Sequence, residues 1–249
     1  MRQKKVVIMV MSSSHDGDYK NLENSIKETW FNLRNEDVEI IFYSDNDTET
    51  EKLDYPVLRG NNLILPCTDG YFSCGVKTVL AFNWLLHNYN FDYVYRSNLG
   101  AFVDPSKIIN FLEGKPKNGF YCGIINRQPH LWKMDFASGS GFFLSKDLVE
   151  LLVINNENFK TNLIDDVSIG EFMYDFNVKI NNSALRADIS DELLPDGNII
   201  YFYKDYHLTE KKVDLIPDEY IYHFRLRSTD RNIDIQNMKY LYEKKLKSL

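Results

Sequence analysis

Apolar runs typical of β-strands alternate with helical patterns along most of the chain. Between the first two runs, Leu22, Ile26, Trp30 and Leu33 recur at the spacing of one helix face. This alternation predicts an α/β fold with a mostly parallel central sheet and helices on both faces. The strand-like runs occupy residues 6–11, 38–43, 63–65, 92–96, 120–125 and 141–144.

The ends of several predicted helices are marked by capping residues. Asp104-Pro105 places a capping side chain before a proline at the first helical position. Ser145 is predicted to cap a helix that runs to residue 152. Residues 76–86 are apolar almost all round, which is typical of a helix enclosed inside a domain. The remaining predicted elements are a polar loop at 155–163, helices at 166–176 and 233–246, and strands at 199–203 and 220–227.

No internal repeat or linker interrupts this pattern, so we expect residues 1–249 to form a single domain. In an open α/β sheet the carboxyl ends of the strands face the ligand crevice. Residues 12–14, 44–45 and 96–100 each follow a predicted strand. We therefore expect these three segments to meet at one rim of the sheet.

Composition and charge narrow the range of partners. Hydrophobic residues make up 44% of the chain and aromatic residues 14%, which is enough for a substantial core and atypical of a disordered protein. The formal net charge of −7 argues against binding of nucleic acid or anionic membrane. No transmembrane segment is predicted, because no apolar stretch approaches the roughly 20 residues that span a bilayer. The run at 6–11 lacks the cleavage pattern of a signal peptide.

The cysteines indicate a reducing compartment. Cys67, Cys74 and Cys122 show no C-x-x-C spacing, which argues against a zinc site and against a secreted disulfide framework. We therefore expect a cytoplasmic protein. The frequent use of Asn, Lys and Ile hints at an AT-rich bacterial or viral genome, and a viral protein would lie in the host cytoplasm.

Five short motifs follow one another between residues 26 and 170. Each is common by itself, but five in a fixed order are hard to obtain by chance. They are Ile26-Lys27-Glu28-Thr29-Trp30, Asp69-Gly70-Tyr71 with Lys77-Thr78, the strand segment 93–104, the segment Ser138-Gly139-Ser140-Gly141 to Ser145, and Asp165-Asp166-Val167-Ser168-Ile169-Gly170. In these motifs and their order the chain resembles the β-1,3-galactosyltransferase and Fringe family of glycosyltransferases.

The resemblance implies a GT-A fold, which is Rossmann-like. It implies a nucleotide-sugar-binding part at about residues 1–115 and an acceptor and catalytic part at about 116–249. The expected donor is a sugar linked to a nucleoside diphosphate, in particular UDP, and the expected acceptor is a hydroxyl group of a glycan or glycoconjugate.

The resemblance also maps the family's catalytic base onto Asp166, with Asp165 in the place of the family's Glu. In an inverting transfer this base takes the proton of the acceptor hydroxyl as its oxygen attacks C1 of the sugar. On local sequence alone, either aspartate could instead cap the following helix.

The motif strand departs from the family at its end. Where the family carries D-x-D, whose carboxylates hold Mn²⁺ or Mg²⁺ against the donor diphosphate, this chain has Asn98-Leu99-Gly100. Asn offers one neutral oxygen, whereas hard divalent cations need several, preferably anionic, oxygens. We therefore expect transfer without a cofactor, with Mn²⁺ or Mg²⁺ as the alternative.

Without a metal, fixed cations must balance the charge of the leaving diphosphate. His223, Arg225 and Arg227 alternate along a predicted strand and so share a face, and Arg suits phosphate oxygens. Lys77 and Arg96 are further candidates. The alternative is that the arginine face is an exposed sheet edge and His223 is structural.

The other expected ligand contacts follow from where the residues lie in the predicted strands and loops. Ser12, Asp45, Asn98 and Gly100 are expected at the donor, although Asp45 could instead begin a turn. At the acceptor we expect Trp132, Asp165 and a loop containing Ser138 and Gly139, where glycine lets the backbone approach a sugar. Turn chemistry explains that loop nearly as well, and a loop tryptophan more often packs on the core.

Two other functions fit these observations. A retaining transferase of similar architecture needs no dedicated base, and the anomeric configuration of the product distinguishes it. A catalytically silent nucleotide-sugar or glycan-binding domain is favoured by the missing acidic pair, whereas Asp166 and the basic cluster favour an enzyme.

Overall fold

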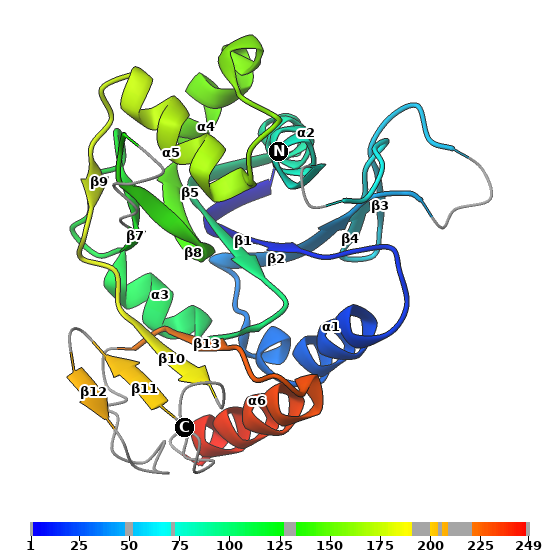
Figure 1. The fold of residues 1–249 in the computed structure, drawn as a ribbon, viewed down its shortest axis with the longest axis vertical. Coiled ribbons are helices and arrows are strands. Elements are labelled where there is room, and N and C mark those ends of the chain that lie inside the picture. The colour runs from blue at the N-terminus through cyan, green and yellow to red at the C-terminus, as the bar shows by residue number, and fades with distance from the viewer. Residues whose placement is uncertain are drawn as a thin grey trace. The chain divides into compact units, whose positions relative to one another are not determined.

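The computed structural model describes residues 2–47, 52–70, 73–126, 133–190, 200–203, 206–208 and 221–247 (Figure 1). The chain divides into two compact units, and their segments alternate along the sequence. Unit 1 comprises Met1–His15, Glu36–Asn98 and Gly114–Ala184, and unit 2 comprises Asp16–Asn35, Leu99–Glu113 and Leu185–Leu249. The single domain and its internal boundary near residue 115 stay predictions.

Unit 1 is built on an eight-stranded sheet with the strand order β3-β4-β2-β1-β5-β8-β7-β9. Its centre is parallel, because β1 pairs in parallel with β2 and β5, and β2 with β4. The expected α/β fold with a mostly parallel centre is therefore confirmed. The strands are β1 Arg2–Met11, β2 Val38–Ser44, β3 Val57–Arg59, β4 Asn62–Ile64, β5 Tyr89–Asn98, β7 Tyr121–Asn126, β8 Phe136–Ser145 and β9 Ile180–Asn181.

Strand β1 is covered on both faces, which is why its sequence is a continuous apolar run rather than an alternating one. Every residue from Val6 to Val10 is 0% exposed. Met11 at its end pairs with Tyr43 of β2 and with Asn98 of β5. The carboxyl ends of these three strands are therefore level, and they form the predicted rim.

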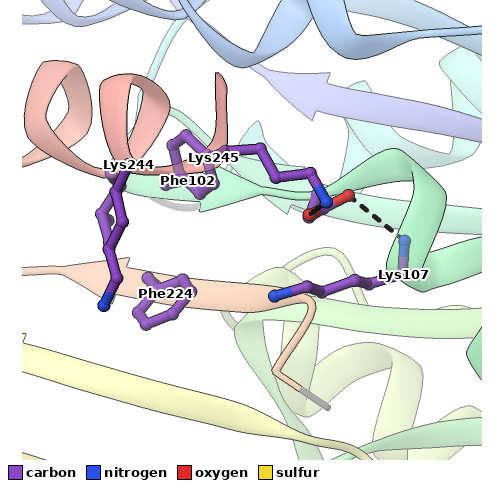
Figure 2. Close-up of a pocket in the computed structure, with 7 residues that line it drawn as sticks. Phe102, Lys107, Phe224, Lys244 and Lys245 are labelled. Atoms are coloured by element: carbon purple, nitrogen blue, oxygen red, sulfur yellow. Dashed lines mark hydrogen bonds and ion pairs between the residues drawn. The ribbon is translucent and has the colours of Figure 1, made fainter. Parts of the chain in front are cut away.

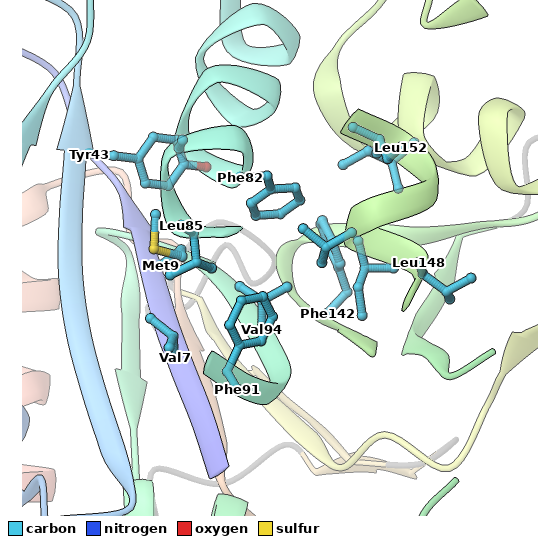
Figure 3. Packing of buried hydrophobic residues seen from close by; sticks show 14 of the residues in the cluster. Val7, Met9, Tyr43, Phe82, Leu85, Phe91, Val94, Phe142, Leu148 and Leu152 are labelled. Carbon is cyan, nitrogen blue, oxygen red and sulfur yellow. The ribbon is translucent and has the colours of Figure 1, made fainter. Parts of the chain in front are cut away.

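The helices α2 Cys74–Asn88, α4 Lys146–Ile154 and α5 Asp165–Asp175 pack on one face of this sheet (Figure 1). Apolar side chains from the sheet, α2 and α4 pack together between the sheet and these helices. Val94, Phe82 and Leu152 belong to this cluster (Figure 3). The apolar character predicted for α2 is explained by this position. Helices on the other face of the sheet stay a prediction.

One local prediction in unit 1 is wrong, because the segment with Ser138 and Gly139, expected as a loop, lies inside β8. Ser145 is the N-cap residue of α4, as predicted, but its hydroxyl makes no hydrogen bond to the helix backbone. Instead it accepts from the backbone N–H of Phe120 at 2.9 Å and donates to Asp147 at 2.6 Å.

Unit 2 contains a five-stranded sheet with the order β12-β11-β10-β13-β6. Trp30 of the first motif is fully buried in this unit, and its indole N–H donates to the carbonyl oxygen of Ala101 at 2.9 Å. The predicted cap at Asp104 is confirmed, because its carboxylate accepts from the backbone N–H groups of Ser106 and Lys107. The elements are β6 Ala101–Val103, β10 Arg186–Ser190, β11 Ile200–Tyr203, β12 Tyr206–Leu208, β13 His223–Leu226, α1 Asp18–Glu28, α3 Pro105–Phe111 and α6 Arg231–Leu246.

No helix in the described ranges combines the length and the apolar character that crossing a bilayer requires.

Candidate active site

Lys77 lies at the rim of the unit 1 sheet, where three segments meet. It comes from α2, and it is 2% exposed. Its Nζ lies 3.1 Å from a carboxylate oxygen of Asp45 and 2.5 Å from one of Asp69, and it donates to the carbonyl oxygen of Ser12 at 3.4 Å. Lys77 thus joins the ends of β1 and β2 to the segment that precedes α2.

The charges in this cluster stabilise one another. Burial would raise the pKa of Asp69, but hydrogen bonds from Lys77 and Ser13 outweigh burial and lower that pKa to about 2. Burial would likewise lower the pKa of Lys77, but Asp69 and Asp45 raise it. Lys77 is therefore charged at neutral pH, and two carboxylates balance its charge.

Asp45 is fully buried, and its carboxylate is engaged by the surrounding backbone. It accepts from the backbone N–H groups of Ser14 at 3.4 Å and Asp47 at 3.2 Å, and from the Ser14 hydroxyl. Such local bonding is typical of an Asp that begins a turn, which was the alternative for this residue. The predicted contact between Asp45 and the donor stays a prediction.

The residues present do not fit a divalent metal well. At the end of β5, Asn98 offers one neutral side-chain oxygen, which is buried and has no hydrogen-bond partner among the described residues. Leu99 and Gly100, which follow, bring no side-chain ligand. Within the described ranges, ligand atoms of His15, Asp45 and Asp69 do lie within 4.8 Å of one another. However, the ammonium group of Lys77 already binds both carboxylates, and it would repel a second cation.

Asp166 and Gly139 form the second part of the site. The backbone N–H of Gly139 in β8 donates to Asp166 at 2.8 Å, and the N–H of Val167 donates to the other carboxylate oxygen at 2.9 Å. A Cβ atom at Gly139 would lie 2.9 Å from the Asp166 carboxylate, so a side chain there would displace it. Glycine at this position therefore allows the first turn of α5 to approach β8.

The surroundings of Asp166 raise its affinity for a proton. Asp166 is partly buried, as is Gly139 beside it. Burial raises the pKa of Asp166, and the negative charge of Asp165 raises it further, while the Gly139 N–H and Arg96 oppose the shift. A carboxylate with a raised pKa accepts a proton more readily near neutral pH. The cap alternative is wrong, since Ile164 is the N-cap and both aspartates lie in the first turn.

Asp165, which precedes Asp166 in α5, is paired with Arg96. Arg96 comes from β5, is 3% exposed, and forms a close ion pair with the Asp165 carboxylate. Tyr43 connects the Lys77 cluster to the part of the site around Asp166. Its hydroxyl lies 3.2 Å from that of Thr78, the residue after Lys77, and it also forms a hydrogen bond with Arg96. Donor binding by Arg96 and acceptor binding by Asp165 stay predictions, since each charge already has a partner.

Sequence reasoning missed two residues of this site. Asp69 lies in the second of the five motifs, so its spacing to Lys77 was a usable signal. Tyr43 gave no signal beyond its apolar strand. Its hydroxyl is fully buried, and burial raises the pKa of that group.

The predicted basic cluster lies in unit 2. β13 is hydrogen-bonded to β10 on one side and to β6 on the other, so the alternative of an exposed edge is wrong. Burial, with Arg186 and Arg225 nearby, holds the pKa of His223 well below its usual range, and His223 is therefore uncharged at neutral pH. Arg225 lies 3.5 Å from the carboxylate of Asp188. Arg225 and Arg227 are both partly exposed, and donor binding by this cluster stays a prediction.

The remaining predicted residues are placed as follows. The Ser138 hydroxyl is buried in β8, 3.2 Å from that of Ser140. The carbonyl oxygen of Gly100 accepts from the N–H of Leu226 at 2.8 Å within unit 2. Trp132 lies outside the described residues. Ligand contacts by Ser12, Asn98, Ser138 and Gly100 stay predictions.

Unit 2 also has a narrow pocket beside α6, lined by Phe102, Phe224 and three lysines (Figure 2). Lys245 reaches Asp104 at 2.8 Å, and the same carboxylate caps α3. The pocket encloses about 10 Å³, which is room for about one water molecule. It is therefore too small for a nucleotide sugar.

Comparison of the sequence with known proteins identifies a family model and a relative that match this chain. A family model described as galactosyltransferase matches residues 22–184, which is 163 of the 249 residues. UDP-GalNAc:beta-1,3-N-acetylgalactosaminyltransferase 2 of Mus musculus is 25% identical over 136 residues, covering 47% of this chain and 26% of the mouse protein. The chain thus spans about a quarter of the length of that relative.

Two solved structures are similar at low identity. A glycosyltransferase involved in the glycosylation of the major capsid of PBCV-1 is 12% identical with a TM-score of 0.49, covering 95% of this chain and 99% of that one. The galactosyltransferase LgtC in complex with donor and acceptor sugar analogues is 10% identical with a TM-score of 0.43, covering 74% and 75%. At such values neither likeness bears on function.

Proposed function

The chain belongs to the galactosyltransferase family, and from that membership we propose that it is an inverting glycosyltransferase. Its donor is a sugar linked to a nucleoside diphosphate, and its acceptor is a hydroxyl group of a glycan or glycoconjugate. Asp166 is the base, and the transfer needs no divalent metal. The mouse relative is named for a UDP-GalNAc donor, which supports a UDP-linked sugar.

The observation that carries the proposal is the environment of Asp166. Two backbone N–H groups orient its carboxylate, it is partly exposed, and its pKa is raised by burial and by Asp165. In the proposed step, an oxygen of this carboxylate takes the proton of the acceptor hydroxyl. The acceptor oxygen then bonds to C1 of the sugar while the bond from C1 to the diphosphate oxygen breaks, and the diphosphate leaves with the electron pair.

Metal independence is supported by the ligand sets of the described residues. The position of the missing acidic pair offers the single neutral oxygen of Asn98, and the nearby carboxylates are held by Lys77. Fixed cations must then balance the developing charge. Arg225 and Arg227 remain the proposed cations, because both are partly exposed, whereas Lys77 and Arg96 are buried.

Incubation with a panel of nucleotide sugars tests the function itself. We expect transfer or slow hydrolysis of one UDP-linked donor, and a product whose anomeric configuration, read by NMR, is opposite to that of the donor. A product of the same configuration would point to a retaining transferase. Thermal stabilisation by a nucleotide sugar without any turnover would point to the silent binding domain, since a specific ligand stabilises the folded state by mass action.

Chelation tests the metal independence. Excess EDTA is expected to leave the transfer rate at its initial value, because the described residues give a divalent cation too few anionic oxygens. The rate is measured before chelation, in EDTA, and after Mn²⁺ or Mg²⁺ is restored. A complete loss in EDTA that the metal reverses would show that the cation is required.

A further inference from the structure

Arg96 occupies an unusual position for a cation in a family that binds a diphosphate. It lies near the end of β5, two residues before Asn98, yet it is 3% exposed. Its guanidinium group lies among apolar side chains of unit 1, with a terminal nitrogen 3.3 Å from the sulfur of Met11 and the carbon centre 5.9 Å from the centroid of the buried Phe142 ring. The side chain therefore points into unit 1.

The partner of Arg96 is the residue immediately before the proposed base. Asp165 is 7% exposed and forms a close ion pair with Arg96. Asp165 and Asp166 are the first two residues of α5. Because the helical backbone joins them rigidly, a force that holds Asp165 also orients Asp166.

Contacts from two strands thus hold the first turn of α5. Arg96 binds Asp165 from β5, and the N–H of Gly139 binds Asp166 from β8. Strands β5 and β8 are neighbours in the sheet, with Arg96 paired to Phe142. The turn therefore rests on two adjacent strands, and each strand contacts one of the two carboxylates.

We propose that Arg96 and Asp165 are positioning residues that aim the Asp166 carboxylate at the acceptor hydroxyl, and that Arg96 does not bind the donor diphosphate. The inference rests on the proposed role of Asp166 as the base. It assigns to the ion pair both a geometric and an electrostatic effect on that base. A misplacement of about 1 Å at a catalytic group can cost about 100-fold in rate.

Arg96 and Asp165 shift the pKa of Asp166 in opposite directions. Burial has the largest effect on the pKa of Asp166, followed by the charge of Asp165 on its own helix, the N–H of Gly139, the charge of Arg96 from β5 and the N–H of Val167. Asp166 in turn contributes to the raised pKa of Tyr121 in β7. The charge of Asp165 raises the pKa of Asp166, whereas the charge of Arg96 lowers it.

The test compares Arg96→Gln with Asp165→Asn in pH–rate profiles of transfer. Activity falls at acid pH as the base becomes protonated, so the acidic limb reports Asp166. We expect this limb to move to higher pH in Arg96→Gln, which removes a positive neighbour. We expect it to move to lower pH in Asp165→Asn, which removes a negative neighbour and leaves Arg96 facing Asp166 alone.

The kinetic constants give a second readout. Both variants should lower kcat, by up to about 100-fold, with the KM for the donor unchanged. The double variant should lose little more than either single variant, because residues that act as one unit are not additive. A large rise in donor KM at constant kcat in Arg96→Gln would overturn the proposal, since it would identify Arg96 as a phosphate ligand.

Controls separate this inference from the proposed function. Asp175→Asn removes a charge at the exposed far end of the same helix and should move neither the limb nor kcat. If Arg96→Gln does not fold, the test rests on Asp165→Asn, whose side chain is nearly isosteric with the original. An acidic limb of its pH–rate profile that does not move would overturn the proposal. Turnover retained in Asp166→Asn would refute the role of Asp166 as the base. Turnover lost in Asp166→Asn, together with unmoved acidic limbs in Arg96→Gln and Asp165→Asn, would refute the positioning pair alone.

Discussion

Asp166→Asn is expected to lower sugar transfer by about 10²–10⁴-fold, the usual contribution of a general base. The substitution replaces one carboxylate oxygen by an NH2 group of similar size. The remaining oxygen can still accept the hydrogen bond that Gly139 donates at 2.8 Å, while the N–H of Val167 loses its acceptor. The first turn of α5 should keep its place, because the Gly139 bond and the ion pair of Arg96 with Asp165 remain. The loss therefore reports the missing proton acceptor rather than a changed fold.

The measurement pairs transfer rate with donor binding. Product formation is followed by mass spectrometry under saturating donor, and donor affinity is followed by calorimetry or thermal shift. Donor affinity should match the unmodified protein, because the proposed role of Asp166 concerns the acceptor hydroxyl. Asp175→Asn, an exposed change on the same helix, serves as the matched control. Turnover near the original rate in Asp166→Asn would rule out the role.

Lys77→Met is expected to lower the free energy of unfolding by about 3–5 kcal/mol, the usual cost of removing one partner of a buried ion pair. Methionine keeps much of the length of the side chain but leaves Asp45, which is fully buried, without the opposite charge 3.1 Å away. For a protein of this size the loss corresponds to a fall of roughly 6–20 °C in the unfolding temperature.

Calorimetry or circular dichroism during heating measures this effect. Lys160→Met is the matched control, because Lys160 forms its ion pair with Glu171 at an exposed position and exposed pairs contribute little to stability. Its unfolding temperature should stay near that of the unmodified protein. If Lys77→Met were equally stable and instead bound the donor weakly, Lys77 would be a donor ligand rather than a structural cation.

The pH dependence of the Lys77 cluster follows from the same contacts. The pKa of Asp69 is lowered to about 2, so its ionised form is the one that the folded state favours. The stabilisation from this carboxylate is present at neutral pH, where the group is ionised whether the chain is folded or unfolded. It is lost as the pH falls toward 2.

Many of the strands and helices could be predicted because their signals are local. The apolar run at residues 6–11 lies on β1, where every residue from Val6 to Val10 is fully buried. In unit 2, the cap at Asp104 begins α3 as expected. The error at β8 has an equally local cause, since Ser138 and Gly139 are residues that usually mark turns. Glycine at position 139 is instead explained by α5, which packs so closely that a Cβ atom there would meet Asp166.

The charged residues were harder to interpret. Lys77 and Arg96 were both predicted as cations for the donor, because a sequence reveals a charge but not the partner that neutralises it. The carboxylate that pairs with Lys77 from β2 lies 32 residues away in the sequence. His223 shows the same limit, since its burial in unit 2 and the arginines around it leave it uncharged at neutral pH.

The sequence by itself determined the family, the alternation of strands and helices, and the candidate base, because periodicity and motif order are properties of neighbouring residues. Only the tertiary structure decided which charges are already paired. It placed Lys77 between two carboxylates and Arg96 against Asp165. The reason is physical, because pairing and burial depend on chain segments that meet only after folding, and together they decide whether a side chain holds the fold or remains able to bind a ligand.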